Sequence, residues 1–367
     1  MQPQHPPSPA TPATSTSSGP EPPRPDAASV LHHVSYNRAD FELPVVSVHP
    51  RQHDPIRATL FRPFKPIEDE EDFSLGQLTR LPFEILSLIL LELDATSILR
   101  LSHVNRSARE LVAAIRPFRD LRDHAVEALC ILFRSGLGSH VPARKLHEAL
   151  TTERCRLCGA FGGFVFLPTA ERCCLTCVAS APETQVTHLS RVAEAAGTSA
   201  DGLIKKGLPV LHTLPDSRKR IVAVRPHAVQ ALEQNGVRDP EAAARRWPDS
   251  LTLRFQAATA LPFVDRSWAA RRRGEDGQVQ RGVSCKGCQV AFERDFSDEH
   301  LEMRDRFYSR EEFLEHFEEC EMAQKLWAAA ERGDGAVEGP RWMALGRTFA
   351  APRERRTSFA RSDRSEE

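Results

Sequence analysis

The clearest pattern of apolar and polar positions lies between residues 78 and 118, where apolar side chains recur at helical spacing. A first helix is expected around Pro82, because a missing N–H costs nothing in the first helical turn. Asp94 is a suitable N-cap for a second short helix, and a third should be stopped by Pro117. The apolar positions of these helices are Leu81, Ile85, Leu86, Ile89, Leu90, Leu93, Ile98, Leu99, Leu101, Val104, Ala108, Leu111, Val112 and Ile115.

Three short helices cannot bury this much apolar surface among themselves. One explanation is that they pack against the rest of the chain, as most apolar stripes do, and composition alone favours it. The other is that the first helix keeps an exposed apolar face for a partner. Periodicity does not decide between the two.

Beyond residue 120 the pattern mixes helices with short strands. The apolar runs FVFL at 164–167 and RIVAV at 220–224 predict strands. The stretch HAVQALEQNG predicts a helix ended by Gly236, and Asp239 with Pro240 marks a further helix start. The expected fold class is therefore α+β and mainly helical.

Both ends of the chain offer little to bury. The first 29 residues hold nine prolines, and the last segment is rich in Arg and Ser, which predicts disordered N- and C-terminal tails. Residues 30–74 carry some apolar clusters and could be partly ordered or only a linker. The predicted layout is a disordered or linker region at 1–74, helical domains or regions at 75–120 and 121–265, a cysteine-containing finger at 266–332 and a tail at 333–367.

Charge and hydropathy narrow the possible partners. The formal net charge is −1, without the basic excess typical of nucleic-acid binding, so the short basic runs at 218–220 and 271–273 are interpreted as solvated surface. The longest aliphatic run, ILSLILLEL, is too short to cross a bilayer. The N-terminus lacks the apolar region of a signal peptide, which predicts an intracellular protein, cytoplasmic or nuclear, with reduced thiols.

Five of the nine cysteines fall between residues 155 and 177. Four of them form two CxxC pairs, Cys155 with Cys158 and Cys174 with Cys177, separated by 15 residues. Each pair aims two sulfurs at one point, and the strand-forming run between them can bring the pairs together. This spacing predicts a structural zinc ion held by four thiolates.

Alternatives remain open for this cluster. Cys173 could replace Cys174 in a different register, although the three-residue gap to Cys177 is a looser chelate; otherwise Cys173, like Cys130, is a small buried hydrophobe. A redox pair of thioredoxin type would favour a βαβ setting without a second CxxC nearby. Four protein ligands leave no open coordination position, so a structural role is expected rather than catalysis.

A second candidate site lies near the C-terminus. Cys285 and Cys288 form another CxxC pair, and His316 and Cys320 lie four positions apart on a helix that Ser309 and Glu312 should cap. Together they supply a three-cysteine, one-histidine zinc site, with Phe313, Phe317 and Trp327 packed around it. His300 is a competing ligand.

The segment LPFEILSLILLELDATSILRLSHVNRSARELV resembles the F-box. It has the Leu-Pro start, the acidic-aliphatic first helix, the mid-motif aspartate and the Val-Asn-Arg turn into the last helix. Many F-boxes carry a tryptophan in that last helix, where this chain reads NRSARELV. The resemblance implies docking onto the Skp-type adaptor of a cullin-RING ubiquitin ligase, mainly through the first helix, by Leu81, Pro82, Ile85, Leu86 and Ile89.

The wider layout, from residue 78 to about 330, is similar to a group of fungal F-box domain proteins, chiefly in the spacings of CRLCGAFGGF…RCCLTC and CKGC…FLEHFEEC…LW. That likeness implies a non-catalytic adaptor that recruits an unidentified protein substrate to a Skp–cullin–F-box ligase. The sequence contains no Gly-rich phosphate-binding loop, no Ser/His/Asp order typical of a catalytic triad and no carboxylate pair in a persuasive context. It therefore gives no reason to expect an enzyme. The alternative is a zinc-finger module that binds protein or nucleic acid, with F-box-like helices that are only structural.

Overall fold

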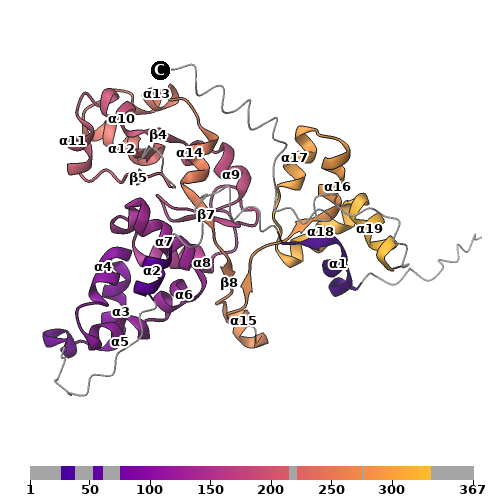
Figure 1. Cartoon of the computed structure of the whole chain (residues 1–367), viewed down its shortest axis with the longest axis horizontal. Helices are drawn as coiled ribbons and strands as arrows, with labels where there is room; N and C mark the ends of the chain where they lie inside the picture. Colours follow the sequence, from indigo (N-terminus) through magenta and orange to yellow (C-terminus); the bar gives the residue numbers. More distant parts are fainter. Residues whose placement is uncertain (1–25, 38–52, 61–74, 215–220, 275–276, 332–367) are drawn as a thin grey trace, which may run out of the picture.

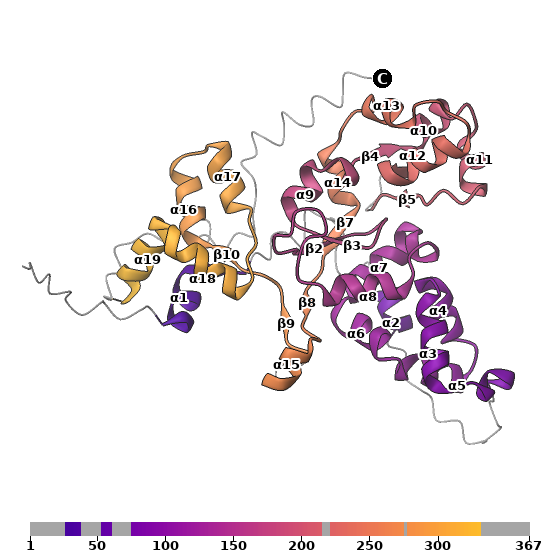
Figure 2. The same cartoon turned by 180° about the vertical axis from the view of Figure 1, so that it is seen from behind.

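A computed structural model describes residues 26–37, 53–60, 75–214, 221–274 and 277–331. Figures 1 and 2 show three groups of elements, named here the helical lobe, the middle lobe and the C-terminal lobe. The chain is an α+β protein dominated by helices, which confirms the expected class. Within these residues no helix is both long and apolar enough to cross a membrane.

The helical lobe contains the residues with the strongest apolar periodicity. Asp94 caps α4 through its carboxylate, as predicted, and Asn105 caps α5 in the same way. Pro117 follows the end of α5 and occupies the first turn of the next helix. The elements are α2 (Asp54–Leu60), η3 (Gly76–Arg80), α3 (Phe83–Glu92), α4 (Ala95–Leu101), α5 (Arg106–Ala114), α6 (Arg116–His124), α7 (Val126–Ser135), η4 (Leu137–Ser139) and α8 (Ala143–Thr151).

The middle lobe combines small antiparallel sheets with short helices. Strand order is β3-β2-β7 in one sheet and β4-β6-β5 in another, while β8 and β9 form a hairpin that carries α15 at its end. The elements are β2 (Phe164–Phe166), β3 (Glu171–Cys173), α9 (Leu175–Ser180), η5 (Pro182–Thr184), β4 (Val186–His188), α10 (Leu189–Ala195), α11 (Ala200–Lys205), β5 (Leu211–His212), β6 (Ile221–Val224), α12 (Arg225–Gln234), α13 (Pro240–Arg245), α14 (Leu251–Gln256), β7 (Ala258–Ala260), β8 (Phe263–Val264), α15 (Trp268–Arg273) and β9 (Val279–Gln280).

The C-terminal lobe joins the two ends of the described chain. Strand β1 pairs with β10 in antiparallel register, and α1 packs against the last two helices. The elements are α1 (Ala27–Val34), β1 (Ser35–Tyr36), β10 (Ser284–Cys285), α16 (Lys286–Arg294), α17 (Asp298–Arg304), α18 (Arg310–Glu319) and α19 (Glu321–Glu331).

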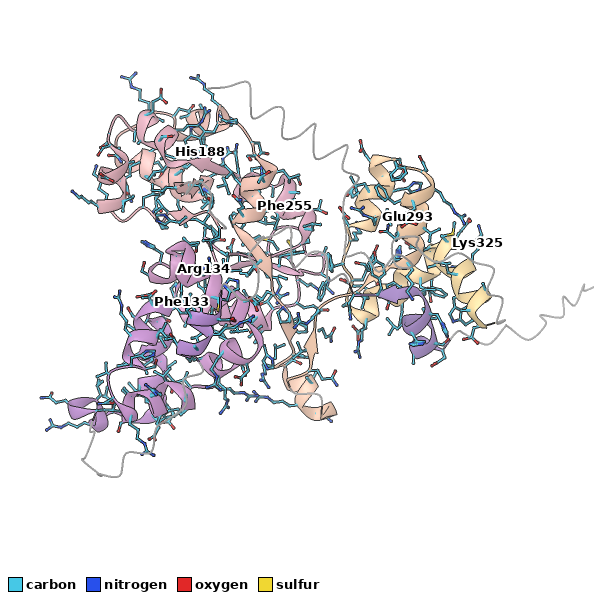
Figure 3. The ribbon with its side chains drawn as sticks, in the orientation of Figure 1. Phe133, Arg134, His188, Phe255, Glu293 and Lys325 are labelled. Carbon is cyan, nitrogen blue, oxygen red and sulfur yellow. The ribbon has the colours of Figure 1, made fainter. Side chains whose placement is uncertain are left out.

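Three apolar cores underlie this arrangement. The largest runs from α3 through α8 into the β2 and β7 strands, so the helical lobe and the first sheet share one interior. A second core lies within the middle lobe around α10 and α12, and the third belongs to the C-terminal lobe. Figure 3 labels Phe133 and Arg134 at the end of α7, where the helical lobe meets the middle lobe. Helices α3, α4 and α5 therefore bury one side against the rest of the chain.

The structure describes part of the region 1–74, where partial order of residues 30–74 was one of the two expectations. Residues 27–36 and 54–60 form helices and a short strand, and Val30, Val34 and His53 are buried. The boundary at residue 265 falls inside the β8–β9 hairpin. Residues 1–25 and 332–367, which include nearly all of the predicted tails, lie outside the described residues.

The β8–β9 hairpin is fastened to the helical lobe by a buried carboxylate. Asp120 on α6 accepts a hydrogen bond of 2.6 Å from Nη2 of Arg266, and Nε2 of His147 lies 3.2 Å from its other oxygen. Asp120 is almost fully buried. A buried charge needs such partners, so this contact fixes the hairpin on α6 and α8.

Candidate metal centres and an exposed helix face

The first cysteine cluster forms where α8 leads into the β2–β3 hairpin. The sulfurs of Cys155, Cys158, Cys174 and Cys177 all lie within 4.8 Å of one another. Cys174 is the N-cap of α9, and its sulfur accepts a hydrogen bond from the backbone N–H of Cys177. The structure thus brings together the four residues that the spacing singled out.

The turn that holds the first CxxC pair is closed by backbone hydrogen bonds. The N–H of Gly159 donates to the carbonyl of Cys155, and the N–H of Cys155 donates to the carbonyl of Ala160. Gly159 has φ +78°, which a side chain would disfavour. The β2–β3 pairing then returns the chain to the second pair, because Phe164 lies opposite Cys173.

The distances and the donor chemistry suit a tetrahedral metal ion. Sulfurs about 2.3 Å from a common centre would be roughly 3.8 Å apart, and Cys158 and Cys174 are 3.6 Å apart. Hydrogen bonds from Cys173 and Cys174 lower the pKa of the Cys155 thiol, whereas burial raises the pKa of Cys177 to about 12. The first cluster can hold one thiolate easily but not four. A bound divalent cation would allow all four thiols to ionise.

Cys173 lies beside the four sulfurs but outside the group that meets at one point. Its side chain is buried in β3 and hydrogen-bonds to Cys155. The register with Cys174 as the converging residue is therefore the one in the structure. Cys130 is buried within α7, as its apolar surroundings predicted.

Arg172 was missed by the sequence reasoning, although it precedes the cysteine run directly. The guanidinium is buried and donates to the carbonyls of Ala149 (2.7 Å), Leu261 (3.2 Å), Pro262 (2.6 Å) and Gly162. Burial lowers its pKa to about 9, so it still carries charge at pH 7. The side chain ties α8, the hairpin and the β7–β8 connection together around the cluster.

The second cluster gathers residues from three elements. Cys285 ends β10 and caps α16, Cys288 lies in the first turn of α16, His316 belongs to α18, and Cys320 is the C-cap of α18. Their ligand atoms lie within 4.8 Å of one another. Sγ of Cys288 is 3.3 Å from Nε2 of His316, and the Cys285–Cys320 sulfur distance is 3.9 Å.

An aromatic residue orients the histidine of this cluster. The ring of Tyr308 stacks on His316 with centroids 4.6 Å apart, and its hydroxyl lies 3.4 Å from Nδ1. A partner at Nδ1 leaves Nε2 free to act as the ligand atom. Sequence reasoning missed Tyr308, since no motif connects it with His316.

The sequence also predicted a capping box, packed aromatic residues and a competing histidine around this cluster. The capping box of Ser309 and Glu312 is present at the start of α18. Phe313 and Phe317 are buried in the same core, and Trp327 meets Phe317 edge to face at 6.1 Å. His300 lies on α17, bonded to the carbonyl of Asp295, and is not among the residues that converge.

Helix α3 has an apolar exposed face. Ile85 and Ile89 are 44% and 47% exposed, and Leu81 before the helix is 38% exposed. Pro82 is the exposed N-cap. The sequence reasoning passed over Phe83 and Leu88, which are 46% and 63% exposed on the same helix.

Leu86 departs from the set assigned to partner binding. Its side chain is 6% exposed and belongs to the main core with Leu90. The helix is apolar on both sides, so periodicity alone cannot tell the buried row from the exposed row. Leu86 is a core residue. Leu88 lies on the exposed face with Ile85 and Ile89, whereas Phe83 is exposed at the first position of the helix.

The structure describes only part of the two basic runs. Residues 218–220 lie outside the described residues. Arg271 and Arg272 are exposed on α15, at the end of the β8–β9 hairpin.

Comparison with protein-family models identifies residues 78–120 as an F-box domain. These residues include α3, α4 and α5, with the exposed face just described. No curated protein and no solved structure matches the chain.

Proposed function

We propose that this chain is a non-catalytic, substrate-recruiting adaptor of a Skp–cullin–F-box ubiquitin ligase. F-box domains generally bind a Skp-type adaptor, and residues 78–120 match that domain. The observation that carries the proposal is the exposed apolar face of α3, formed by Ile85, Leu88 and Ile89, with Leu81 and Phe83 exposed at the start of the helix. An exposed apolar row of this size on a soluble helix is typical of a docking surface.

We assign both cysteine clusters to structural zinc. Three or four thiolates with at most one imidazole suit Zn²⁺ better than a hard cation. Each cluster supplies four protein ligands, which leaves no coordination position for a reacting water. The ion would therefore stabilise the middle and C-terminal lobes, whose surfaces are available to a protein substrate. We also propose that the chain is related to the fungal F-box proteins that carry two such clusters.

Capture of the recombinant chain by purified Skp-type adaptor tests the docking face. The wild-type chain should be retained, and the double variant Leu81→Glu, Ile85→Glu should lose at least tenfold in retention, because two buried charges would replace apolar contacts.

A matched variant controls for the added charge. Ile204 and Leu251 are 38% and 42% exposed in the middle lobe, and Ile204→Glu, Leu251→Glu should be retained like wild type. If a folded, zinc-loaded wild-type chain is not captured, the adaptor proposal fails and the zinc-module alternative becomes the better one.

A further inference from the structure

The segment Asp26–Tyr36 lies within the C-terminal lobe although it comes from the opposite end of the chain. Nζ of Lys286 donates a 2.7 Å hydrogen bond to the carbonyl of His33, which is 253 positions earlier. Both views place α1 beside α18 and α19 (Figures 1 and 2).

The contacts are those of an integral element. Val30 and Val34, one helical turn apart, are 1% and 0% exposed and join the apolar core of the lobe. Nε1 of Trp327 donates to Oγ of Ser29 at 3.1 Å. Asp26 caps the helix by accepting from the N–H of Ser29.

The same segment reaches the second cysteine cluster. Strand β1 pairs with β10 so that Ser35 lies opposite Cys285 and Tyr36 lies opposite Ser284. Cys285 and Cys288 share the core that contains Val30 and Val34. The backbone that carries one ligand is therefore held by a strand from the N-terminal segment.

Neither part has enough stability by itself. An isolated helix of eight residues is only marginally formed in water. A lobe of roughly 50 residues is near the size at which a metal or a further element is needed for folding.

We propose that Asp26–Tyr36 completes the second metal site, so that docking of this segment and metal binding strengthen each other. In this proposal the surface of β10, α18 and α19, together with Lys286 of α16, is a peptide-binding site occupied by this segment of the same chain. Because coupling between two binding events is reciprocal, the metal raises affinity for the segment by the same factor as the segment raises affinity for the metal. The proposal rests on the assignment of a metal ion to the second cluster but not on the adaptor function, since the exposed face of α3 plays no part in it.

Zinc release from the full chain, followed with a colorimetric chelator, tests the coupling. The wild type should release two zinc ions per chain, and Val30→Asp, Val34→Asp should release one of them at least tenfold faster. Ala28→Asp, His32→Asp places the same charges on the exposed side of α1 and should match wild type. The valine substitutions are also made in a Cys158→Ser chain, which lacks the first site. Faster release of its remaining ion identifies the affected ion as the one at the second site.

A peptide experiment separates lost docking from general misfolding. A chain lacking residues 1–37 should regain slow zinc release when a peptide of residues 26–37 is added, and the same peptide with both valines replaced by aspartate should have no effect. Equal release by the wild type and the valine variant, absence of rescue by the peptide, or a Cys158→Ser chain that binds no zinc would overturn the proposal.

Discussion

Individual residues fix the two metal sites and the first helices in place. Several of them do so because they are buried, and they belong to no sequence motif. His53 is the clearest case. It comes directly before α2, it is 2% exposed, and its Nε2 lies 3.5 Å from Glu127 on α7. Burial lowers the pKa of His53 to about 4, assisted by the charges of Arg134 and Arg57.

Attachment of α2 should therefore depend on pH. The folded pKa lies below the unfolded value of about 6.5, so the attached state is favoured in full above pH 6.5. The unfolded segment binds the extra proton between pH 6.5 and about 4, and stability falls through that window by up to roughly 3 kcal/mol. Protection factors of the α2 amides in hydrogen exchange should decrease over this range, and a His53→Gln variant should show a flatter profile. An unchanged wild-type profile would contradict the burial argument.

Tyr308 should control the second metal site without contacting the metal. Replacement by Phe keeps the stacked ring but removes the hydroxyl partner of Nδ1 on His316. Loss of such a partner typically weakens metal binding about 10- to 100-fold. Competition with a chelator should show this loss for one zinc ion per chain, while the ion at the first cluster serves as the internal control. Equal affinity in both proteins would assign Tyr308 to packing alone.

At the scale of elements, local signals predicted helix starts well and the use of helix faces poorly. The caps at Asp94 and Ser309 were recognisable because capping involves residues three positions apart. The three CxxC pairs were recognisable for the same reason. Ile85 and Leu86 could not be sorted into exposed and buried rows, since that depends on which side of α3 packs against α8 and the main core.

The two faces of α3 should separate stability from binding. Leu86→Ala removes buried atoms and should lower the free energy of unfolding by about 2–5 kcal/mol. Ile89→Ala, on the exposed side, should change it by less than about 0.5 kcal/mol but weaken capture by the Skp-type adaptor. Urea denaturation and adaptor capture measured on both variants check this. The reverse pattern would mean that the exposed row is not the docking face.

At the scale of the whole molecule, composition gave no indication of where the N-terminal region packs. Residues 27–36 follow a proline-rich stretch and show too short a pattern to be recognised, yet they complete a distant lobe. Pairings between positions some 250 residues apart leave no local signal. Tyr308 and Arg172 were missed for a related reason, because their partners are set by tertiary contacts.

The two metal sites lie in different apolar cores, so loss of a ligand at one site should affect other parts of the chain than loss of a ligand at the other. Cys155, Cys174 and Cys177 belong to or pack against the core that also contains α3 to α8, whereas the second cluster lies in its own core. Cys320→Ser should make the C-terminal lobe sensitive to protease and leave adaptor capture unchanged. Cys158→Ser should reduce both protease resistance of the middle lobe and adaptor capture. Limited proteolysis with mass spectrometry and the capture assay distinguish these outcomes, and an equal effect of both variants on capture would contradict the division.

The meeting of α1 with the C-terminal lobe also sets an order of events during synthesis. Val30 and Val34 leave the ribosome early, but the helices that bury them are complete only near Trp327. At typical rates of translation, roughly 15–60 s separate the two moments. The helical lobe, whose contacts are closer in sequence, can fold meanwhile. Helix α1 must then remain available until α18 and α19 have been made. During that interval its apolar side is unburied, so chaperones would be needed mainly for this segment.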